Sequence, residues 1–300
     1  MPAEPGGAGA AADALPRTIY FMWDQGIDRA PLVVRKCLES WTEKNPAWEI
    51  VVLDRNNLET YVRLEVPPEK LDRMEKNHLA DLVRVHLLAG HGGVWVDATV
   101  YCMRPLDEWL HGCMDSGFFC FHRPGPDRVM ASWFLAAAKG HPIPARMSVE
   151  FTKYWARHRF ELGPRFKGRR GKAVKAKAER WFNRNEHSTR HWFSPFVTRL
   201  LRIYPYFAFH YLFAKLVTDD PACRGIWSRT RKISADGPHR LQQHGLFADL
   251  DAAIKDEIDR ARRPLYKLTW KFDPGRYRDG CVLHYLLEGR VVREERDAGR

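Results

Sequence analysis

The sequence predicts an α/β fold in which a parallel sheet is flanked by helices. Segments typical of strands and of helices alternate in the N-terminal third of the chain, and this alternation favours a parallel sheet. With 300 residues and 45% hydrophobic composition, the chain is long enough to bury a full core. We expect one domain over residues 15–300, preceded by a disordered lead-in over residues 1–14 that is rich in Gly, Ala and Pro.

Three segments near the N-terminus establish the alternation. Thr18–Met22 is rich in β-branched and aromatic residues and is predicted as a strand, with residues 23–26 as its turn. A helix is predicted to begin near Pro31, because proline lacks an N–H and suits the first helical position. Residues 48–53 are predicted as a second strand, and the polar residues 54–57 lead into a short helix.

Asp81 and Arg84 lie on a predicted helix that precedes a glycine cluster. They are three residues apart and therefore share one helical face. The apolar residues of this helix repeat at core-facing spacing on another face: Leu79, Leu82, Val83 and Leu87. Two interpretations are open, namely that the polar pair faces a ligand or that it forms an ordinary surface ion pair.

Gly90, His91, Gly92 and Gly93 are predicted to end this helix, since glycine permits positive backbone angles and close approach by another group. Residues 94–96 are predicted as a buried strand that runs out at Asp97. Ligands in open α/β sheets bind outside the carboxyl ends of strands. Asp97 is therefore a candidate ligand-binding residue, or else the cap of a loop.

The order of these motifs resembles the donor-site block of the capsular polysaccharide synthesis glycosyltransferases. These are relatives of the DXD-containing sugar transferases, which include initiating α-1,6-mannosyltransferases and the glucosylating domains of large clostridial toxins. The resemblance covers roughly residues 16–287 and is carried by these segments: 23–26, 40–41, 45–46, 80–84, 92–100, 104–106, 116–119, 233–238 and 267–271, the last of which reads KLTWK.

The resemblance implies a GT-A-like fold with a Rossmann-type nucleotide-sugar-binding sheet. It also implies transfer of a sugar from a nucleotide-sugar donor, with retention at the anomeric carbon. By position it gives Asp81 and Arg84 contacts to the donor sugar and its phosphate, and makes Asp97 the first acid of a DXD motif. These three residues are the catalytic candidates, and Gly92 and Gly93 join the donor-binding set.

The resemblance leaves the cofactor open, because Thr99 stands where a second acid is expected. Manganese and magnesium prefer several oxygen ligands, typically including substrate phosphates and water. Either Asp97, the Thr99 hydroxyl and substrate phosphates complete a weaker metal site, or basic residues neutralise the diphosphate.

Other segments supply further donor-binding candidates. By resemblance, Trp23 stacks on the base, although it also fits a core tryptophan, and Asp24 either contacts the ribose or caps its turn. Asp236, with His239 nearby, lies in a predicted Asp-Gly-Pro turn. The resemblance places a comparable loop at the mouth of the site, where Asp236 would approach the acceptor or the ion. An aspartate before glycine is also ordinary turn chemistry.

Thr269 and Trp270 lie between Lys267 and Lys271. The resemblance places a polar residue and a tryptophan from this region over the diphosphate. The alternative is a half-buried strand with alternating basic residues.

Basic charge is concentrated in one segment of the chain. The sequence has 49 Lys or Arg and 37 Asp or Glu, a formal net charge of +12. Residues 151–215 hold 16 of the basic residues against three Glu, within a predicted basic and aromatic helical insertion over residues 151–217. Such composition is typical of segments that bind anionic membrane surfaces, and the alternative is a solvated basic loop followed by a buried aromatic helix.

The sequence also indicates the cellular compartment in which the protein is expected. Six cysteines without CxxC pairs or framework spacing are predicted to be reduced and mostly buried. No apolar run reaches the ~18 residues that cross a bilayer, and the N-terminus lacks a secretion-signal pattern. These features predict a cytoplasmic protein, peripheral on the inner face of the plasma membrane if the basic segment binds lipid.

The predicted function is transfer of a sugar from a nucleotide-sugar donor to a polysaccharide or lipid-linked oligosaccharide acceptor, in capsule or surface polysaccharide synthesis. One rival is a catalytically weak protein that binds a sugar nucleotide without turnover, motivated by Thr99. Another is a nucleic-acid-binding protein, motivated by the basic aromatic segment. The latter leaves the motifs around Asp97 without a purpose, so no nucleic-acid partner is expected.

Overall fold

The computed structural model describes residues 15–157 and 168–289, and it is built on a five-stranded mixed sheet with strand order β2-β1-β3-β6-β5. Strands β1 (Thr18–Met22), β2 (Glu49–Leu53) and β3 (Gly93–Asp97) are parallel. Strand β6 (Arg128–Ala137) lies antiparallel to β3, and β5 (Phe118–Gly125) lies antiparallel to β6. The lead-in predicted over residues 1–14 lies outside the described residues.

The α/β prediction is confirmed, with one correction to the sheet. The parallel arrangement holds for β1, β2 and β3, whereas β5 and β6 form an antiparallel hairpin. Only residues 126 and 127 separate these two strands, and so short a connection joins only antiparallel neighbours.

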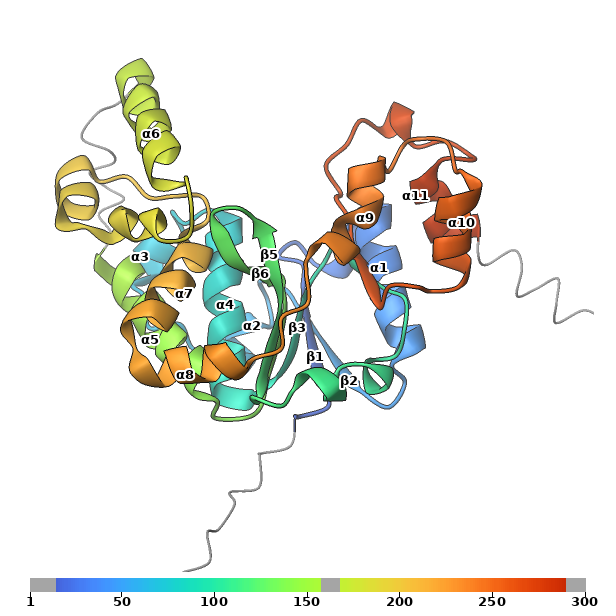
Figure 1. Ribbon diagram of the computed structural model, residues 1–300, viewed down its shortest axis with the longest axis horizontal. Helices are drawn as coiled ribbons and strands as arrows, with labels where there is room; N and C mark the ends of the chain where they lie inside the picture. Colours follow the sequence, from blue (N-terminus) through green and yellow to red (C-terminus); the bar gives the residue numbers. More distant parts are fainter. Residues whose placement is uncertain (1–14, 158–167, 290–300) are drawn as a thin grey trace, which may run out of the picture.

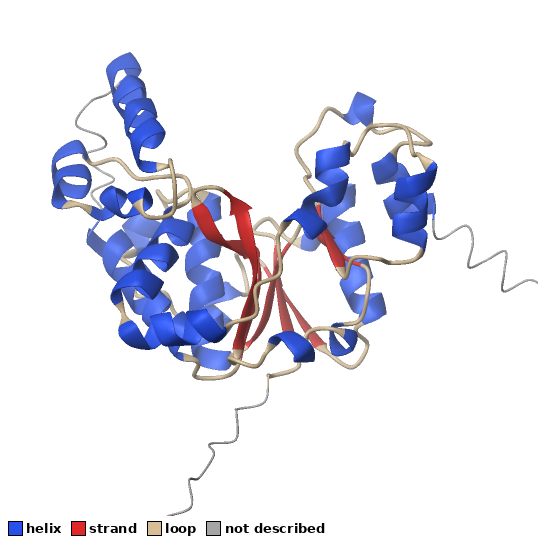
Figure 2. Cartoon of the chain, in the orientation of Figure 1, coloured by secondary structure: helices blue, strands red, loops and turns tan. Residues whose placement is uncertain are grey.

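Helices pack on both faces of the sheet (Figures 1 and 2). Their bounds are α1 (Leu32–Lys44), α2 (Leu58–Tyr61), α3 (Pro68–Leu71), α4 (Lys76–His91), α5 (Pro142–Arg157), α6 (Gly168–Phe182), α7 (Ala208–Asp219), α8 (Pro221–Arg229), α9 (Asp236–His244), α10 (Ala252–Asp259) and α11 (Val282–His284). Shorter helical turns are η1 (Ile27–Arg29), η2 (Leu106–Glu108), η3 (His111–Cys113), η5 (Ser188–Phe193), η6 (Phe196–Leu201), η7 (Pro274–Arg276) and η8 (Tyr285–Gly289).

The sheet is buried on both sides because alternate residues of a strand point to opposite faces. In β1, Ile19 and Phe21 join a core with α1 and α9 to α11. Tyr20 and Met22 join a second core with α4, α5 and α7. The sheet is therefore the middle of three layers, as Figure 1 shows.

The junction between α4 and β3 requires its two glycines. Gly92 and Gly93 have φ angles of +70° and +96°, where L side chains are strained. A Cβ on Gly92 would lie 2.6 Å from the Lys139 backbone nitrogen, and one on Gly93 would lie 2.7 Å from the Thr18 carbonyl oxygen. The predicted helix stop is confirmed at Gly92, where backbone approaches closely, whereas Gly90 and His91 still belong to the last turn of α4.

A second, two-stranded sheet brings the C-terminal part of the chain beside the end of β3. Strands β4 (Val100–Cys102) and β7 (Leu265–Lys267) pair antiparallel. The Leu268 N–H continues this pairing by donating to the Thr99 carbonyl at 2.7 Å. Residues far apart in the sequence thus meet where β3 ends.

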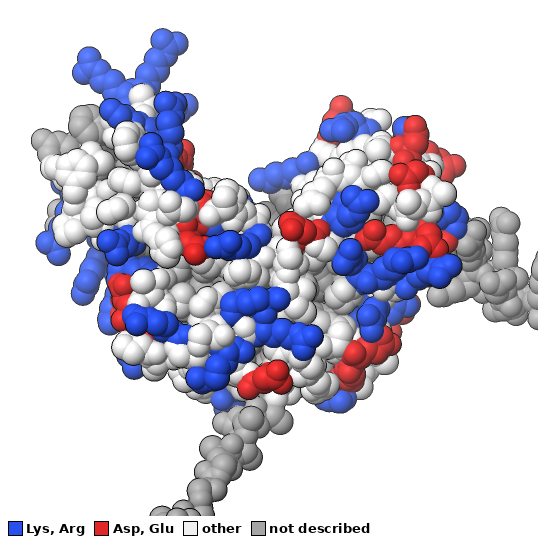
Figure 3. Space-filling model, in the orientation of Figure 1, with Lys and Arg blue, Asp and Glu red and all other residues white. Residues whose placement is uncertain are grey.

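The described part of residues 151–217 is mostly helical. It comprises the end of α5, then α6, η5, η6 and most of α7. Helix α6 extends away from the body of the molecule (Figure 1), and its Lys and Arg side chains stand out in Figure 3. Residues 158–167, with the first part of the basic run, lie outside the described residues.

Two further expectations concern cysteines and membrane spans. All six cysteines are buried, as predicted. Among the described helices, none combines the length and the apolar character needed to cross a bilayer.

Candidate functional site

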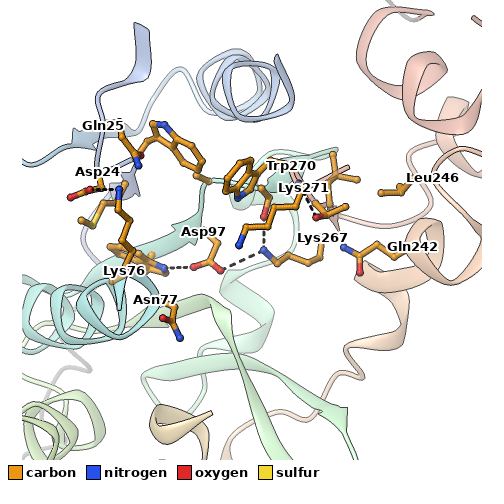
Figure 4. Close-up of a pocket in the computed structure, with 18 of the residues that line it drawn as sticks. Asp24, Gln25, Lys76, Asn77, Asp97, Gln242, Leu246, Lys267, Trp270 and Lys271 are labelled. Atoms are coloured by element: carbon orange, nitrogen blue, oxygen red, sulfur yellow. Dashed lines mark hydrogen bonds and ion pairs between the residues drawn. The ribbon is translucent and has the colours of Figure 1, made fainter. Parts of the chain in front are cut away.

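A cavity of about 870 Å³ lies at the carboxyl ends of β1 and β3. Its walls are the segment after β1, the first turns of α4, the end of β3, and parts of the chain from the end of α9 through β7 to Arg276. We call it the edge cavity, and Figure 4 shows side chains that line it. Its position is the one where open α/β sheets bind ligands.

Arg84 lines this cavity and joins two carboxylates, of which Asp97 lines the edge cavity and Asp81 does not. Its Nη2 lies 3.3 Å from Asp81 Oδ1 and 3.2 Å from Asp97 Oδ1, and its Nη1 donates to the Ser132 carbonyl at 2.6 Å. Asp81 and Arg84 are both buried, so the surface-pair interpretation is wrong. Because most of its N–H groups have protein partners, the guanidinium chiefly orients the two carboxylates.

Asp97 is held as an anion. Burial alone would raise its pKa, but the charges of Arg84 and Lys267 and a hydrogen bond from Trp95 lower the pKa to about 2. The Trp95 Nε1 donates to Asp97 Oδ1 at 3.0 Å. The carboxylate at the end of β3 therefore stays charged at neutral pH.

Lys267, at the end of β7, reaches the other side of Asp97. Its Nζ lies 3.5 Å from Asp97 Oδ2 and donates to the Thr99 Oγ1 at 2.5 Å. Figure 4 shows its ammonium directed toward the Asp97 carboxylate. Both oxygens of this carboxylate thus face positively charged groups.

Two tryptophans form an aromatic wall of the edge cavity. The rings of Trp23 and Trp270 meet edge to face, with centroids 5.4 Å apart. Trp23 is half-buried against the core, and within the described chain its Nε1 has no hydrogen-bond partner. Trp270 is 41% exposed. Trp23 therefore packs on the core, as one interpretation predicts, and also lines the cavity; its stacking on a base stays a prediction.

Asp24 is part of an ion-pair cluster at the rim. Its Oδ2 lies 2.9 Å from the Lys76 Nζ and 3.0 Å from the Arg55 Nη2. Burial tends to raise the pKa of Asp24, but the hydrogen bonds from Lys76 and Arg55 outweigh this and lower it. Asp24 thus holds Lys76 at the cavity (Figure 4).

Positive charge predominates in the edge cavity. Two acids, Asp24 and Asp97, line it with five basic residues, a formal balance of +3. The basic residues are Lys76, Arg84, Lys267, Lys271 and Arg276. This balance suits an anionic ligand.

A second cavity of about 590 Å³ adjoins the first and shares Arg84, Asp97 and Lys267 with it. We call it the adjoining cavity. Asp236 and His239 line this cavity and are not in the lining of the edge cavity. The structure therefore separates them from the predicted donor-binding residues Thr269 and Trp270, which do line the edge cavity.

The predicted Asp-Gly-Pro turn is wrong, because Asp236 and the two residues after it begin α9. An acid in the first turn is favourable next to the helix dipole. Pro238 is tolerated there because the first N–H groups of a helix have no intrahelical acceptor. Asp236 also accepts a hydrogen bond from the Ser234 hydroxyl at 2.8 Å.

Gly92 and Gly93 are placed away from the site. They lie at the start of β3, whereas Asp97 lies at its other end, and neither lines the edge cavity. We correct the donor-binding assignment of these two glycines: close backbone packing accounts for them.

Sequence reasoning did not assign site roles to Lys76, Lys267, Arg276 and His210. His210 lines the adjoining cavity, and burial, aided by Arg128 and Arg84, lowers its pKa to about 3, so the imidazole is neutral. Of these four residues, only Lys267 could have been found from the sequence, because alternate positions 267, 269 and 271 share one side of an extended segment.

Asp97 and Thr99, the two predicted metal ligands, do not fit a divalent cation as they are arranged. Lys267 contacts both side chains, and the remaining carboxylate oxygen faces Arg84 and Trp95. Over residues 15–157 and 168–289, no group of three or more His, Cys, Asp or Glu is placed to hold a metal ion.

A family model described as capsular polysaccharide synthesis protein matches residues 11–162, just over half of the chain. The chain therefore belongs to the capsular polysaccharide synthesis protein family. The resemblance inferred from the motifs around Asp97 is confirmed.

Curated relatives are named as glycosyltransferases. Over 159 residues, 46% of this chain and 38% of the relative, the chain is 28% identical to the O-glycosyltransferase braB of Annulohypoxylon truncatum. Over 163 residues, 46% of this chain and 42% of the relative, it is 26% identical to the initiation-specific alpha-1,6-mannosyltransferase of Candida albicans. The matches thus span about two fifths of the length of these relatives.

Among solved structures, the chain aligns with the PaToxG Glycosyltransferase. The alignment covers 83% of this chain and 86% of that one, with 11% sequence identity and a TM-score of 0.37.

Proposed function

We propose that the protein is a GT-A-like glycosyltransferase that takes a sugar from a nucleotide-sugar donor and passes it to a polysaccharide or lipid-linked oligosaccharide acceptor. The observation that carries this proposal is the edge cavity, where basic side chains outnumber acids at the carboxyl ends of β1 and β3. Family membership and relatives that are named as glycosyltransferases support it.

The donor would lie across the edge cavity. Trp23 and Trp270 offer aromatic surface to a base, and the basic residues offer charge to two phosphates. Arg84 and Asp97 line both cavities. The anomeric carbon would therefore lie where the cavities meet, with the acceptor approaching through the adjoining cavity.

Catalysis in this arrangement is mainly electrostatic. As the bond to the anomeric carbon breaks, negative charge grows on the departing diphosphate. Fixed positive groups that face this charge lower the barrier, because they need no reorganisation during the reaction. The salt-bridged network of Arg84, Asp97 and Lys267 supplies such fixed groups. We propose retention at the anomeric carbon, which the anomeric proton coupling of the product would show.

The adjoining cavity suits a glycan. Its lining combines aromatic rings with neutral hydrogen-bonding groups, as in Trp133, Tyr206, Gln242 and Gln243. Aromatic faces and amides bind the apolar and hydroxyl surfaces of sugars. Together with the family, this supports an acceptor from capsule or surface polysaccharide synthesis.

A panel of nucleotide sugars tests the proposed function. We expect at least one donor to raise the melting temperature and to release its nucleoside diphosphate slowly by hydrolysis, since ligand binding to the folded state stabilises it. Thermal shift and a coupled assay for nucleoside diphosphate measure the two effects. If no donor stabilises the protein or is turned over, the proposal is wrong.

We further propose that helix α6 holds the protein peripherally at the cytoplasmic face of an anionic membrane. The helix carries six basic residues against one acid, Glu179. Trp181 at its end and Phe196 and Leu200 on η6 are 53%, 57% and 41% exposed. Basic charge beside exposed aromatic and aliphatic side chains favours binding to anionic lipid. Most of α7 is buried, so the aromatic residues of that helix contribute little to the proposed membrane contact.

Replacing Lys172 and Lys177 with Gln is expected to weaken binding to phosphatidylglycerol-containing vesicles. The loss should be about 1 kcal/mol per removed charge, measured by cosedimentation at low salt. Lys215→Gln, the same change at a half-buried lysine of α7 that pairs with Asp219, should bind like the unchanged protein. Equal binding by the double variant and the unchanged protein would exclude α6 as the contact.

A further inference from the structure

The ammonium group of Lys267 occupies the space between Asp97 and Thr99. Its Nζ lies 3.5 Å from Asp97 Oδ2 and 2.5 Å from the Thr99 Oγ1, and the side chain is 17% exposed. These are the two side chains that a DXD-type metal site would use. A positive charge of the protein itself therefore lies where such a site would place a cation.

Backbone pairing fixes this position. Lys267 pairs with Val100 in the β4–β7 sheet, and the Leu268 N–H donates to the Thr99 carbonyl at 2.7 Å. Strand β4 is itself anchored, because the Trp41 Nε1 donates to the Val100 carbonyl at 2.8 Å. The register of two strands thus sets Lys267 beside residues 97 and 99.

The surrounding charges oppose a metal ion at this point. Magnesium needs oxygen ligands at about 2.0–2.1 Å, yet Asp97 Oδ2 faces Lys267 and Asp97 Oδ1 faces Arg84. A cation on either oxygen would lie beside an ammonium or a guanidinium, with repulsion that only an anionic partner relieves. The neutral hydroxyl of Thr99 adds no negative charge that would hold a metal cation.

The Lys267 ammonium has an N–H group that can bind a ligand. A lysine ammonium has three N–H donors, and the structure gives Lys267 two oxygen contacts, to Asp97 and Thr99. Lys267 lines both cavities. Within the described part of the chain, one N–H group thus remains for a phosphate oxygen at the junction where the diphosphate of the proposed nucleotide sugar would lie.

We propose that Lys267 supplies the positive charge that a divalent cation supplies in DXD transferases, so that this chain binds the diphosphate of its donor without a metal ion. Asp97 and Thr99 hold the ammonium in place, and Lys271 and Arg276 extend the positive surface toward the rim. The inference rests on the proposed function, because it names how that donor is bound.

The test is calorimetric titration of the full chain with UDP, GDP, ADP, CDP and dTDP, each in excess EDTA and in Mn²⁺. We expect the nucleotide that binds to have the same Kd in both buffers. Lys267→Met should weaken the binding of that nucleoside diphosphate roughly ten- to a hundredfold, the range for one charge-assisted hydrogen bond. It should leave the weaker binding of the corresponding monophosphate unchanged, whereas a general loss of structure would weaken both.

Lys215→Met, at a half-buried lysine that pairs with Asp219 outside both cavities, is the control and should bind like the unchanged protein. Binding that requires Mn²⁺, or a Lys267→Met variant with unchanged diphosphate affinity, would overturn the inference and leave the proposed function standing. Absence of binding by every nucleoside diphosphate in both buffers would instead refute the proposed function.

Discussion

Asp97→Asn is expected to reduce sugar transfer on the order of a hundredfold or more, the range for removing one preorganised electrostatic group. The uncharged amide no longer pairs with Arg84 at 3.2 Å and Lys267 at 3.5 Å, so the positive groups lose their fixed positions. The measurement is the release of nucleoside diphosphate from the best donor, with near-ultraviolet circular dichroism to establish that tertiary structure is kept.

The matched control for this prediction is Asp72→Asn, at an exposed aspartate outside both cavities. Its turnover should equal that of the unchanged protein. A folded Asp97→Asn variant with full turnover would mean that the end of β3 is not the reaction centre.

Arg84→Met is expected to lower the free energy of unfolding by about 3–5 kcal/mol, because removing one partner of a buried ion pair leaves its counter-charge uncompensated. Here the substitution leaves the buried Asp81 carboxylate and the Asp97 carboxylate without their shared guanidinium. It also removes the donor to the Ser132 carbonyl. Urea unfolding followed by tryptophan fluorescence measures the change.

Arg104→Met provides the comparison on the surface. Arg104 pairs with Glu108 one helical turn away, with 38% and 50% of the two side chains exposed. Exposed pairs contribute about 0–1 kcal/mol, so this variant should lose little stability. Equal losses for the two arginines would show that the Arg84 cluster has no special structural role.

The sequence was sufficient to predict features that depend on local chemistry. Thr18–Met22 was predicted with the bounds that the structure shows. The stop of α4 at Gly92 and the end of β3 at Asp97 also agree, since glycine conformation and short-range hydrophobicity determine them. Local rules failed at the segment that starts at Asp236, because its residue types suit both a turn and the first turn of a helix.

Features that depend on distant contacts were not predictable in this way. Lys267 meets Asp97 across 170 residues of sequence, and only the pairing of β4 with β7 creates that contact. The burial of Asp81 and Arg84 likewise follows from the packing of α4 against the sheet and α7, where the Arg84 guanidinium lies 5.1 Å from the Trp95 ring and 5.7 Å from the Phe209 ring. The sequence shows which residues share a helical face, but it does not show which other elements pack against that face.

The most direct test of this account is a crystal structure of the protein with the nucleoside diphosphate that stabilises it best. We expect the base against Trp23 and Trp270, and a terminal phosphate oxygen within hydrogen-bond distance of the Lys267 ammonium, beside Asp97. A nucleotide bound elsewhere, with its phosphates away from the carboxyl ends of β1 and β3, would contradict it.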